Sequence, residues 1–389
     1  QKQLTVLCVD QSKSMSWFGF GFNGFGQISR ADVSGQVKCK VNSPVLISDN
    51  ECKSGVNRSD RRIRACWSSR ADLQQTQSGS GVYLSGCVCG PSAQVCASQG
   101  CTDALISETH LTLSFTDRVE LWEIKPQQNQ LVWKREHELS EQTAALPLVS
   151  GGFVQHKPPF FHPLKLCAVS LVLGSEHALL LTADGTLYSW GSGSHGQLGH
   201  GALTSLEDPQ AVEALWGVPI KAVAAGNWHS AAVSSGGDLY MWGWNESGQL
   251  GLPSRGLEEE KRRGNGSGND DQPINTDEKS QTDVFISIQA FPALVDIANM
   301  SEISRISCGS RHTAAVTSAG DLYTWGWGQY GQLGHGTEHS TDEPTPVDYF
   351  SSHSLSVKDV VCGSWNTFVS VVPKETSSVL TETHPGLLN

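Results

Sequence analysis

One glycine-rich pattern occurs three times in the chain, and this internal repeat constrains the fold more than any other feature. It reads LGSEHALLLTADGTLYSWGSGSHGQLGHG at 173–201, AGNWHSAAVSSGGDLYMWGWNESGQLGLP at 225–253 and CGSRHTAAVTSAGDLYTWGWGQYGQLGHG at 308–336. A fourth copy, CGSWNTFVSVV at 362–372, begins the same way and then stops. The spacing of the copies indicates a period of about 52 residues, with an insert in the longest interval.

Each copy has the pattern of short antiparallel strands. A short apolar strand ends at the first glycine, a second strand such as HTAAV follows, and a turn such as SAGD precedes the third strand, LYTWGWG. The turn glycine suits the positive φ of a tight hairpin. A weaker fourth strand carries Pro344 and Pro346, which fits an edge strand because proline lacks an N–H. Such units are typical of propeller blades, so we predict an all-β, closed β-propeller of four-stranded blades.

The two ends of the chain carry complementary halves of one repeat. The stretch WFGFGFNGFGQ at 17–27 matches the end of a third strand, with Phe18 and Phe20 in place of Trp325 and Trp327. The copy at 362–372 supplies the missing first half. We expect the two halves to pair in one blade, because this closes the ring and leaves no blade edge exposed.

Two degenerate units, at 63–90 and 107–122, lie between these ends and the clear copies, so six blades can be counted with the closing blade. The domain organisation that we predict is an N-terminal extension over 1–16, a single propeller over 17–373 and a disordered tail over 374–389. Within the propeller we expect a tether at 133–165, outside the repeat pattern, and a disordered acidic insert at 252–285.

The composition excludes several classes of protein. A net charge of −12 argues against broad binding to nucleic acid, which needs a basic surface, and predicts no sequence-specific nucleic-acid contact. No run of about 18 apolar residues is present, so we expect no membrane span. The 11 cysteines are odd in number and scattered, which favours reduced, intracellular thiols over a disulfide scaffold.

The chain contains no serine elbow, paired carboxylates, P-loop or H-E-x-x-H arrangement, so we expect no enzyme activity, catalytic residue, cofactor or metal. The repeated histidines stand one per blade, and Asn366 takes their place in the fourth copy, which favours a structural role over zinc binding. Zinc sites favour paired C-x-x-C spacings. One group of cysteines departs from that spacing, which argues against a zinc or redox site there: Cys87, Cys89, Cys96 and Cys101.

The residues that recur with the repeat are predicted to pack the blades or to order their turns. They are Gly174, His177, Trp190, Gly226, His229, Trp242, Gly309, His312, Trp325, Gly363, Phe18 and Phe20.

The segment GGFVQHKPPFFHP at 151–163 differs from the repeat because it combines phenylalanine with proline. Prolines restrict the unbound chain and aromatic rings provide anchors, which is typical of docking segments. We therefore predict partner binding through Phe153, Phe160 and Phe161. The alternative is a tether that packs across the blades.

The motif W-G-x-G-x-x-G-Q-L-G, preceded by G-x-x-H and a hairpin glycine, resembles the regulator of chromosome condensation repeat family. With the half-repeats and the degenerate units, the resemblance covers about 17–372. It implies seven blades rather than six, and the region 123–165 is where a further blade would fit.

The resemblance also implies two functions. The first is an adaptor in a chromatin-regulating complex with a jumonji-type 2-oxoglutarate dioxygenase, linked to histone methylation and chromosome segregation, with histones as further partners. It implies a nuclear, chromosome-associated protein, with the cytoplasm as a second location. The alternative is a guanine-nucleotide exchange factor for a Ran-like GTPase. The adaptor is favoured, because the chain lacks a basic tail and its long insert is acidic rather than wedge-like.

Overall fold

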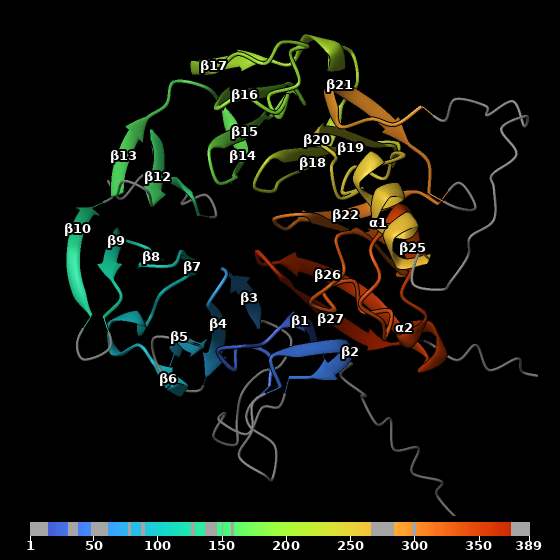
Figure 1. Cartoon of the computed structure of the whole chain (residues 1–389). Helices are drawn as coiled ribbons and strands as arrows, with labels where there is room; N and C mark the ends of the chain where they lie inside the picture. Colours follow the sequence, from blue (N-terminus) through green and yellow to red (C-terminus); the bar gives the residue numbers. More distant parts are fainter. Residues whose placement is uncertain are drawn as a thin grey trace, which may run out of the picture.

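The computed structural model describes residues 15–29, 38–47, 61–76, 79–86, 90–125, 129–136, 146–149, 151–156, 159–265, 284–297 and 301–374. Seven antiparallel sheets stand in a ring around a common axis (Figure 1). The prediction of an all-β propeller is confirmed, and seven blades replace the six that could be counted from the sequence. Among the described helices, none is long and apolar enough to cross a membrane.

We number the blades in chain order. Blade 1 contains β3 (Arg62–Ala65), β4 (Ser69–Thr76), β5 (Gly79–Gly86) and β6 (Gly90–Gln94). Blade 2 contains β7 (Asp103–Ile106), β8 (His110–Ser114), β9 (Arg118–Glu123) and β10 (Gln130–Glu136). In blade 3 the described residues form three strands, β11 (Leu148–Val149), β12 (Gly152–His156) and β13 (Pro159–Pro163).

Blades 4 to 6 are the three clear repeats. Blade 4 contains β14 (Ala168–Leu173), β15 (His177–Thr182), β16 (Leu187–Gly191) and β17 (Leu206–Ala211). Blade 5 contains β18 (Ile220–Ala225), β19 (His229–Ser234), β20 (Leu239–Trp244) and β21 (Ile288–Val295). Blade 6 contains β22 (Ile303–Cys308), β23 (His312–Thr317), β24 (Leu322–Gly326) and β25 (Thr341–Pro346).

Blade 7 joins the two ends of the chain. Its strand order is β2 (Lys40–Leu46), β1 (Ser16–Phe22), β27 (Asn366–Pro373) and β26 (Leu355–Cys362). Phe18 lies opposite Val369 and Phe20 opposite Thr367 in the β1–β27 register. The predicted ring closure is therefore confirmed.

The predicted alignment of the opening stretch is wrong by two residues. Phe20, not Phe18, lies opposite the strand-two residue that faces Trp325 in blade 6, since Thr367 and Thr313 occupy equivalent positions. A shift of two preserves which face of a strand each side chain occupies, so the alternating phenylalanines did not distinguish the two registers. The correct register is indicated by Gln27, which corresponds to Gln332 of the third copy.

The prediction of a tether outside the blades at 133–165 is wrong. The start of this region is the end of β10, and the strands described between 148 and 163 form blade 3. Pro159 and Pro163 bound β13, which is the edge strand of that sheet, and there a missing N–H costs little.

The insert predicted to be disordered is also corrected in part. Residues 255–265 form α1 (Arg255–Asn265), while 266–283 lie outside the described residues, as do 1–14 and 375–389. Leu257 is buried and anchors the helix on the turn at Gly248. Two i,i+4 ion pairs, Arg255 with Glu259 and Arg262 with Glu258, lie along its exposed side. The remaining helices are short: η2 (Cys96–Ser98), η3 (Glu213–Leu215) and α2 (Asp348–Ser352).

Large apolar side chains fill the spaces between neighbouring blades. Trp325 of blade 6 packs with Met241 and Leu250 of blade 5, and Phe20 of blade 7 packs with Ala314 and Val316 of blade 6. Trp242, Trp325 and Phe20 are among the largest fully buried side chains. The core is therefore a series of interfaces between sheets, and each blade depends on its neighbours for burial.

Candidate interaction surface

The repeated histidines connect each blade to the next. The Nε2 atoms of His177, His229 and His312 lie 2.8, 3.0 and 3.0 Å from the hydroxyls of Ser230, Thr313 and Thr367 in the following blade. Those hydroxyls donate in turn to the carbonyl oxygens of Gln197, Gln249 and Gln332, at 2.8, 2.7 and 2.8 Å. Since each hydroxyl has one hydrogen and gives it to the carbonyl, each histidine must donate from a protonated Nε2.

These histidines are neutral structural groups. Burial lowers the pKa of His177 to about 4 and the pKa of His229 and of His312 to about 3. Each ring also lies against the first glycine of its own repeat: a Cβ at Gly174 would stand 2.6 Å from Cε1 of His177. The G-x-x-H spacing thus brings a ring onto a position that only glycine can occupy.

The indoles of the repeat complete the same connections. Trp242 and Trp325 donate from Nε1 to the carbonyl oxygens of Gln197 and Gln249, at 2.8 and 3.0 Å. Trp190 follows the irregular blade 3 and instead packs against Phe153, with ring centroids 5.7 Å apart. The first tryptophan of each repeat therefore holds two blades together rather than presenting a ring to a ligand.

The glutamine side chains shape the loops that follow the third strands. Oε1 of Gln332 accepts a hydrogen bond from the backbone N–H of Tyr330 at 3.0 Å, and Oε1 of Gln27 accepts one from Phe25 at 3.1 Å. Gln197 does the same for His195 at 2.8 Å. This two-residue turn places Tyr330, Phe25 and His195, none of them fully buried, at one end of the ring.

Further rings gather at the same end of the ring, and we call the set the aromatic face. It consists of Phe22, Phe25, Trp67, His195, Trp228, Trp244, Trp327, Tyr330 and Trp365, together with Arg311. All of these side chains are half-buried except Trp67, which is 47% exposed. They come from blades 4, 5, 6, 7 and 1, which are consecutive around the ring.

The rings of the aromatic face contact one another in sequence. Trp327 lies 4.9 Å from both Tyr330 and Trp365, and Phe22 connects Tyr330 at 5.1 Å to Phe25 at 5.7 Å. Most of these pairs are edge-to-face, the preferred geometry for such rings. Beside them, the guanidinium of Arg311 lies 4.7 Å over Trp244, and Trp228 packs at 5.4 Å on the same indole.

The aromatic face can bind another macromolecule but offers no catalytic chemistry. Tryptophan, tyrosine and arginine are the residue types that most often dominate the energy of protein interfaces. Their mutual packing fixes their rotamers before a partner arrives, which lowers the entropic cost of binding. No pair of acid and base accompanies them among the named members.

The centre of the ring holds a cavity of about 660 Å³. It is lined by the innermost strands, and Glu108, Glu176 and His177 are among its polar residues. The Glu108 carboxylate accepts hydrogen bonds from the N–H of Trp67 and the hydroxyl of Ser68, both at 2.6 Å. Burial raises the pKa of the Cys66 and Cys362 thiols in this cavity to about 12, so they are poor nucleophiles.

The predicted docking residues lie in blade 3. Phe153 is 4% exposed and belongs to the core with Leu171 and Leu180, so its side chain is not available to a partner in this structure. Phe161 is half-buried, stacked on Trp133 at 6.3 Å with Arg135 over its ring at 3.9 Å. The side chain of Phe160, on β13, is outside the described residues. Partner binding through this segment stays a prediction.

Of the cysteine group, Cys87 and Cys89 lie outside the described residues, as does the side chain of Cys96. Cys101 is a buried free thiol, and burial raises its pKa to about 11.

Sequence reasoning missed most of the aromatic face. Trp244 and Trp327 recur with the repeat, which favours a packing role for them, and Trp228 and Trp365 occupy a position that varies between the copies. The available signal was the variable residue just before the repeated histidine, which is Trp228, Arg311 or Trp365 in three consecutive blades. That position follows the innermost strand and therefore points out of the end of the ring.

Comparison with known proteins agrees with the fold. The family model described as "Regulator of chromosome condensation (RCC1) repeat" matches residues 184–233, 236–316 and 319–370. The chain is 41% identical to mouse RCC1 domain-containing protein 1, over 93% of this chain and 98% of the relative. It is 40% identical to the human protein of that name, over 92% and 97%. The crystal structure of Prp20p from Saccharomyces cerevisiae has a TM-score of 0.67 at 19% identity, over 94% of this chain and 93% of that one.

Proposed function

This chain belongs to the regulator of chromosome condensation (RCC1) repeat family, and we propose that it is a non-catalytic adaptor that binds a protein partner through the aromatic face. The observation that carries the proposal is a set of partly exposed rings that spans five blades in two packed groups. One group is Phe22, Phe25, Trp67, Trp327, Tyr330 and Trp365, and the other is His195, Trp228 and Trp244 with Arg311. Isolated exposed rings are ordinary on protein surfaces, whereas pre-packed groups of rings are typical of an interaction site.

The partner that we propose is a jumonji-type 2-oxoglutarate dioxygenase in a nuclear, chromosome-associated complex, with histones as further partners. The support is the resemblance in the repeats, together with similarity to the mouse and human relatives over nearly their whole length. The central thiols and carboxylates do not favour an enzyme, because the two thiols with the pKa of about 12 stay protonated at neutral pH.

The test is binding of purified chain to a purified dioxygenase of this class, with variants Trp67→Ala and Trp365→Ala. Loss of a central aromatic anchor costs about 2 kcal/mol or more, which is roughly a thirtyfold loss of affinity. The matched control is Trp216→Ala, because Trp216 is 64% exposed and contributes to none of the contacts of the aromatic face. Affinity that is unchanged in both aromatic-face variants would refute this docking surface.

The alternative is a guanine-nucleotide exchange factor for a Ran-like GTPase. Prp20p has been described with its binding properties to Gsp1p and histones, and its likeness to this chain at 19% identity supports the alternative only weakly. We expect the purified chain to leave the release of fluorescent nucleotide from Ran at its intrinsic rate. Acceleration at catalytic concentrations of the chain would favour exchange over the adaptor.

A further inference from the structure

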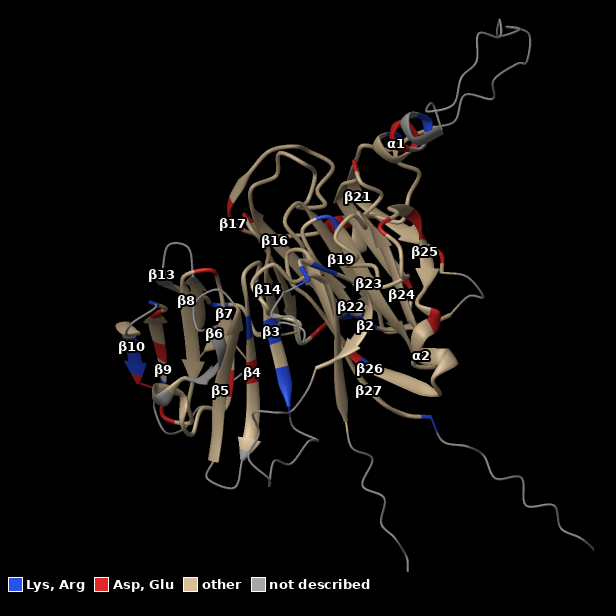
Figure 2. Cartoon of the chain, turned by 60° about the horizontal axis from the view of Figure 1, so that its bottom comes forward, with Lys and Arg blue, Asp and Glu red and all other residues tan. Residues whose placement is uncertain are grey.

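The end of the ring opposite the aromatic face carries a second surface, with the opposite chemistry. A cavity of about 670 Å³ opens there and is lined by Arg61, Arg62, Arg305 and Lys358, with Asp359 as its acidic residue. We call it the basic pocket. Arg61 and Arg62 lie at the start of β3, and Arg305 and Lys358 lie within β22 and β26, whereas the aromatic face follows the ends of the same strands. Figure 2 shows the basic residues of β3 toward the lower end of that strand.

The charge of the basic pocket contrasts with that of the whole chain. Its lining has four cations against one carboxylate, within a protein of net charge −12, and two of the cations have ion-pair partners behind the lining, Arg61 with Asp72 and Arg62 with Asp103. Random placement in an acidic protein would not concentrate cations in one cavity, and such clustering raises the local concentration of anions.

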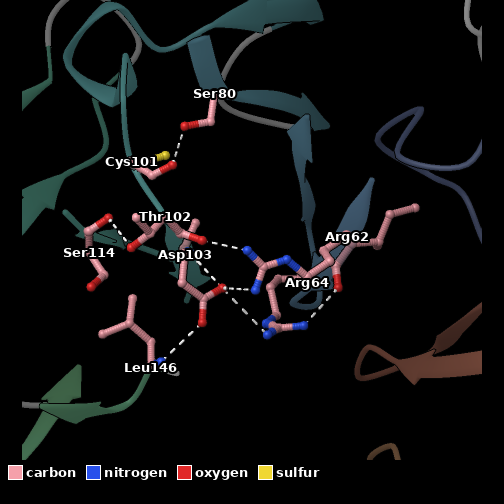
Figure 3. Close-up of polar contacts among 10 residues, drawn as sticks. Arg62, Arg64, Ser80, Cys101, Thr102, Asp103, Ser114 and Leu146 are labelled. Carbon is pink, nitrogen blue, oxygen red and sulfur yellow. Dashed lines mark hydrogen bonds and ion pairs between the residues drawn. The ribbon is translucent and has the colours of Figure 1, made fainter. Parts of the chain in front are cut away.

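Two of the arginines of β3 are held in place by a single carboxylate. Oδ1 of Asp103 lies 3.3 Å from Nη1 of Arg62 and 3.6 Å from Nη2 of Arg64, and Arg62 also donates to the carbonyl of Thr102 (Figure 3). Oδ2 of Asp103 accepts a hydrogen bond from the N–H of Leu146 at 3.0 Å, which fixes the carboxylate from blade 3. The Arg62 side chain remains 45% exposed, so it is oriented without being covered.

The other two exposed cations are less constrained. Within the described part of the chain, neither Arg305 nor Lys358 forms a salt bridge, and both side chains are exposed. Asp359, the acidic neighbour, is half-buried and accepts a hydrogen bond from the N–H of Val360 at 3.0 Å. Burial raises the pKa of this carboxyl group, while the charges of Arg305 and Arg64 act to lower it, so Asp359 is a charge partner of Arg305.

An independent observation points to a ligand at the same place. Ser370 on β27 lines the basic pocket, is fully buried, and its Oγ has no hydrogen-bond partner. Buried hydroxyls are nearly always hydrogen-bonded, and one left unpaired beside a cavity is typical of a binding site. Gln74, Ser80 and Thr102 bring further polar groups to the same wall.

We infer that the basic pocket binds a small polyanion that carries several phosphate groups. Arg62, Arg305 and Lys358 line the pocket from three different strands, and a polyphosphate offers several anionic groups to such a set of cations, which a single carboxylate does not. A cavity of this size accommodates a small molecule rather than a folded domain. The inference is independent of the adaptor function, because it concerns the opposite end of the ring.

The test measures the affinity of the full chain for inositol hexakisphosphate, the probe, by isothermal titration calorimetry at fixed ionic strength. The variant is the double reversal Arg305→Glu and Lys358→Glu, which we expect to weaken binding at least about tenfold, since charge-assisted contacts to phosphate are lost. The matched control is Arg255→Glu and Arg262→Glu on α1, whose side chains are 70% and 73% exposed. Both doubles change the net charge equally, and the α1 double also removes the ion pairs of Arg255 with Glu259 and of Arg262 with Glu258, which lie on the exposed side of that helix.

Ser370→Ala provides a second measurement that separates binding from folding. The hydroxyl makes no hydrogen bond within the described protein, so its removal should leave the thermal midpoint unchanged while weakening the probe several-fold. Equal loss of affinity in the two charge reversals would overturn the proposal, because it would show a general charge effect. The proposal is also overturned if Arg305→Glu with Lys358→Glu leaves the affinity for the probe unchanged. A third contrary result would be a DNA duplex that displaces the probe at a concentration below that of the probe itself and whose binding is weakened by the same double reversal.

Discussion

Thr313→Val should destabilise the protein although it preserves the shape of the side chain. Thr313 and His229 are both fully buried, and the threonine hydroxyl accepts from His229 at 3.0 Å and donates to the carbonyl of Gln249 at 2.7 Å. Valine leaves the Nε2–H of His229 without a partner, which costs about 1–3 kcal/mol, and removes a net bond worth about 1 kcal/mol. The carbonyl of Gln249 keeps its bond from Trp325 at 3.0 Å, so it adds no further penalty.

We therefore expect a loss of about 3 kcal/mol in the free energy of unfolding, measured from the urea midpoint at constant slope. Two controls accompany it. Thr313→Ser keeps the hydroxyl, as Ser230 does at the same position in blade 5, and should lose much less. Thr345→Val on the edge strand β25 removes a hydroxyl bonded only to Glu343 within its own strand and should change stability by less than about 0.5 kcal/mol. If Thr313→Ser loses as much as Thr313→Val, packing rather than the hydrogen bonds explains the residue, and the reasoning fails.

Three further predictions concern stability. Burial lowers the pKa of His177 to about 4 and of His229 and His312 to about 3, so the unfolded chain binds more protons than the folded chain below about pH 6.5. Stability should be fully present above that pH and fall as the pH drops, and His312→Asn should flatten the fall in thermal midpoint between pH 7 and 5. Phe20→Ala, which empties a fully buried position in the closing blade, should cost about 3–5 kcal/mol by urea unfolding; a loss below 1 kcal/mol would mean that closure contributes little. Phe153→Ala should lower the thermal midpoint markedly, because Phe153 is part of a buried core cluster. An unchanged midpoint together with lost partner binding would instead show that Phe153 is a docking anchor.

The sequence predicted the repeated parts of the fold because the same physical requirement recurs there. A glycine beneath a histidine ring and an indole directed at the next blade are needed at every regular interface, so they repeat and can be recognised. Closure could be predicted for the same reason. The two-residue error in its register arose because alternation alone carries no information about a shift of two.

Blade 3 could not be predicted because it lacks those requirements. Its described residues form three strands. At the interface between blade 3 and blade 4, Trp190 contacts the ring of Phe153, whereas the equivalent tryptophans of blades 5 and 6 donate to a glutamine carbonyl oxygen. The prolines of this segment favoured a docking segment or a tether, yet Pro159 and Pro163 bound an edge strand, where proline is tolerated. The helix α1 was missed for another reason, since the burial of a single residue, Leu257, stabilises an otherwise polar segment.

The surfaces differ from the core because nothing in the repeat fixes their residues. The aromatic face occupies variable positions of the motif, and the cations of the basic pocket lie at or within innermost strands, at positions that differ from blade to blade. Only the ring brings Arg62, Arg305 and Lys358 together from positions far apart in sequence. A single repeat therefore predicts the scaffold but not its two ends.

Both ends depend on the closing blade. Phe22 and Trp365 contribute to the aromatic face, and Lys358 and Ser370 line the basic pocket, although all four belong to or adjoin one sheet formed by the two ends of the chain. Removal of β1 would therefore take away one of the two neighbours of β27, leaving β26, and disturb both surfaces at once. Partner binding and polyanion binding that fail together in such a truncation would report lost closure, whereas point variants at one end should affect only that end. The independence of the two surfaces can thus be established only in the closed ring.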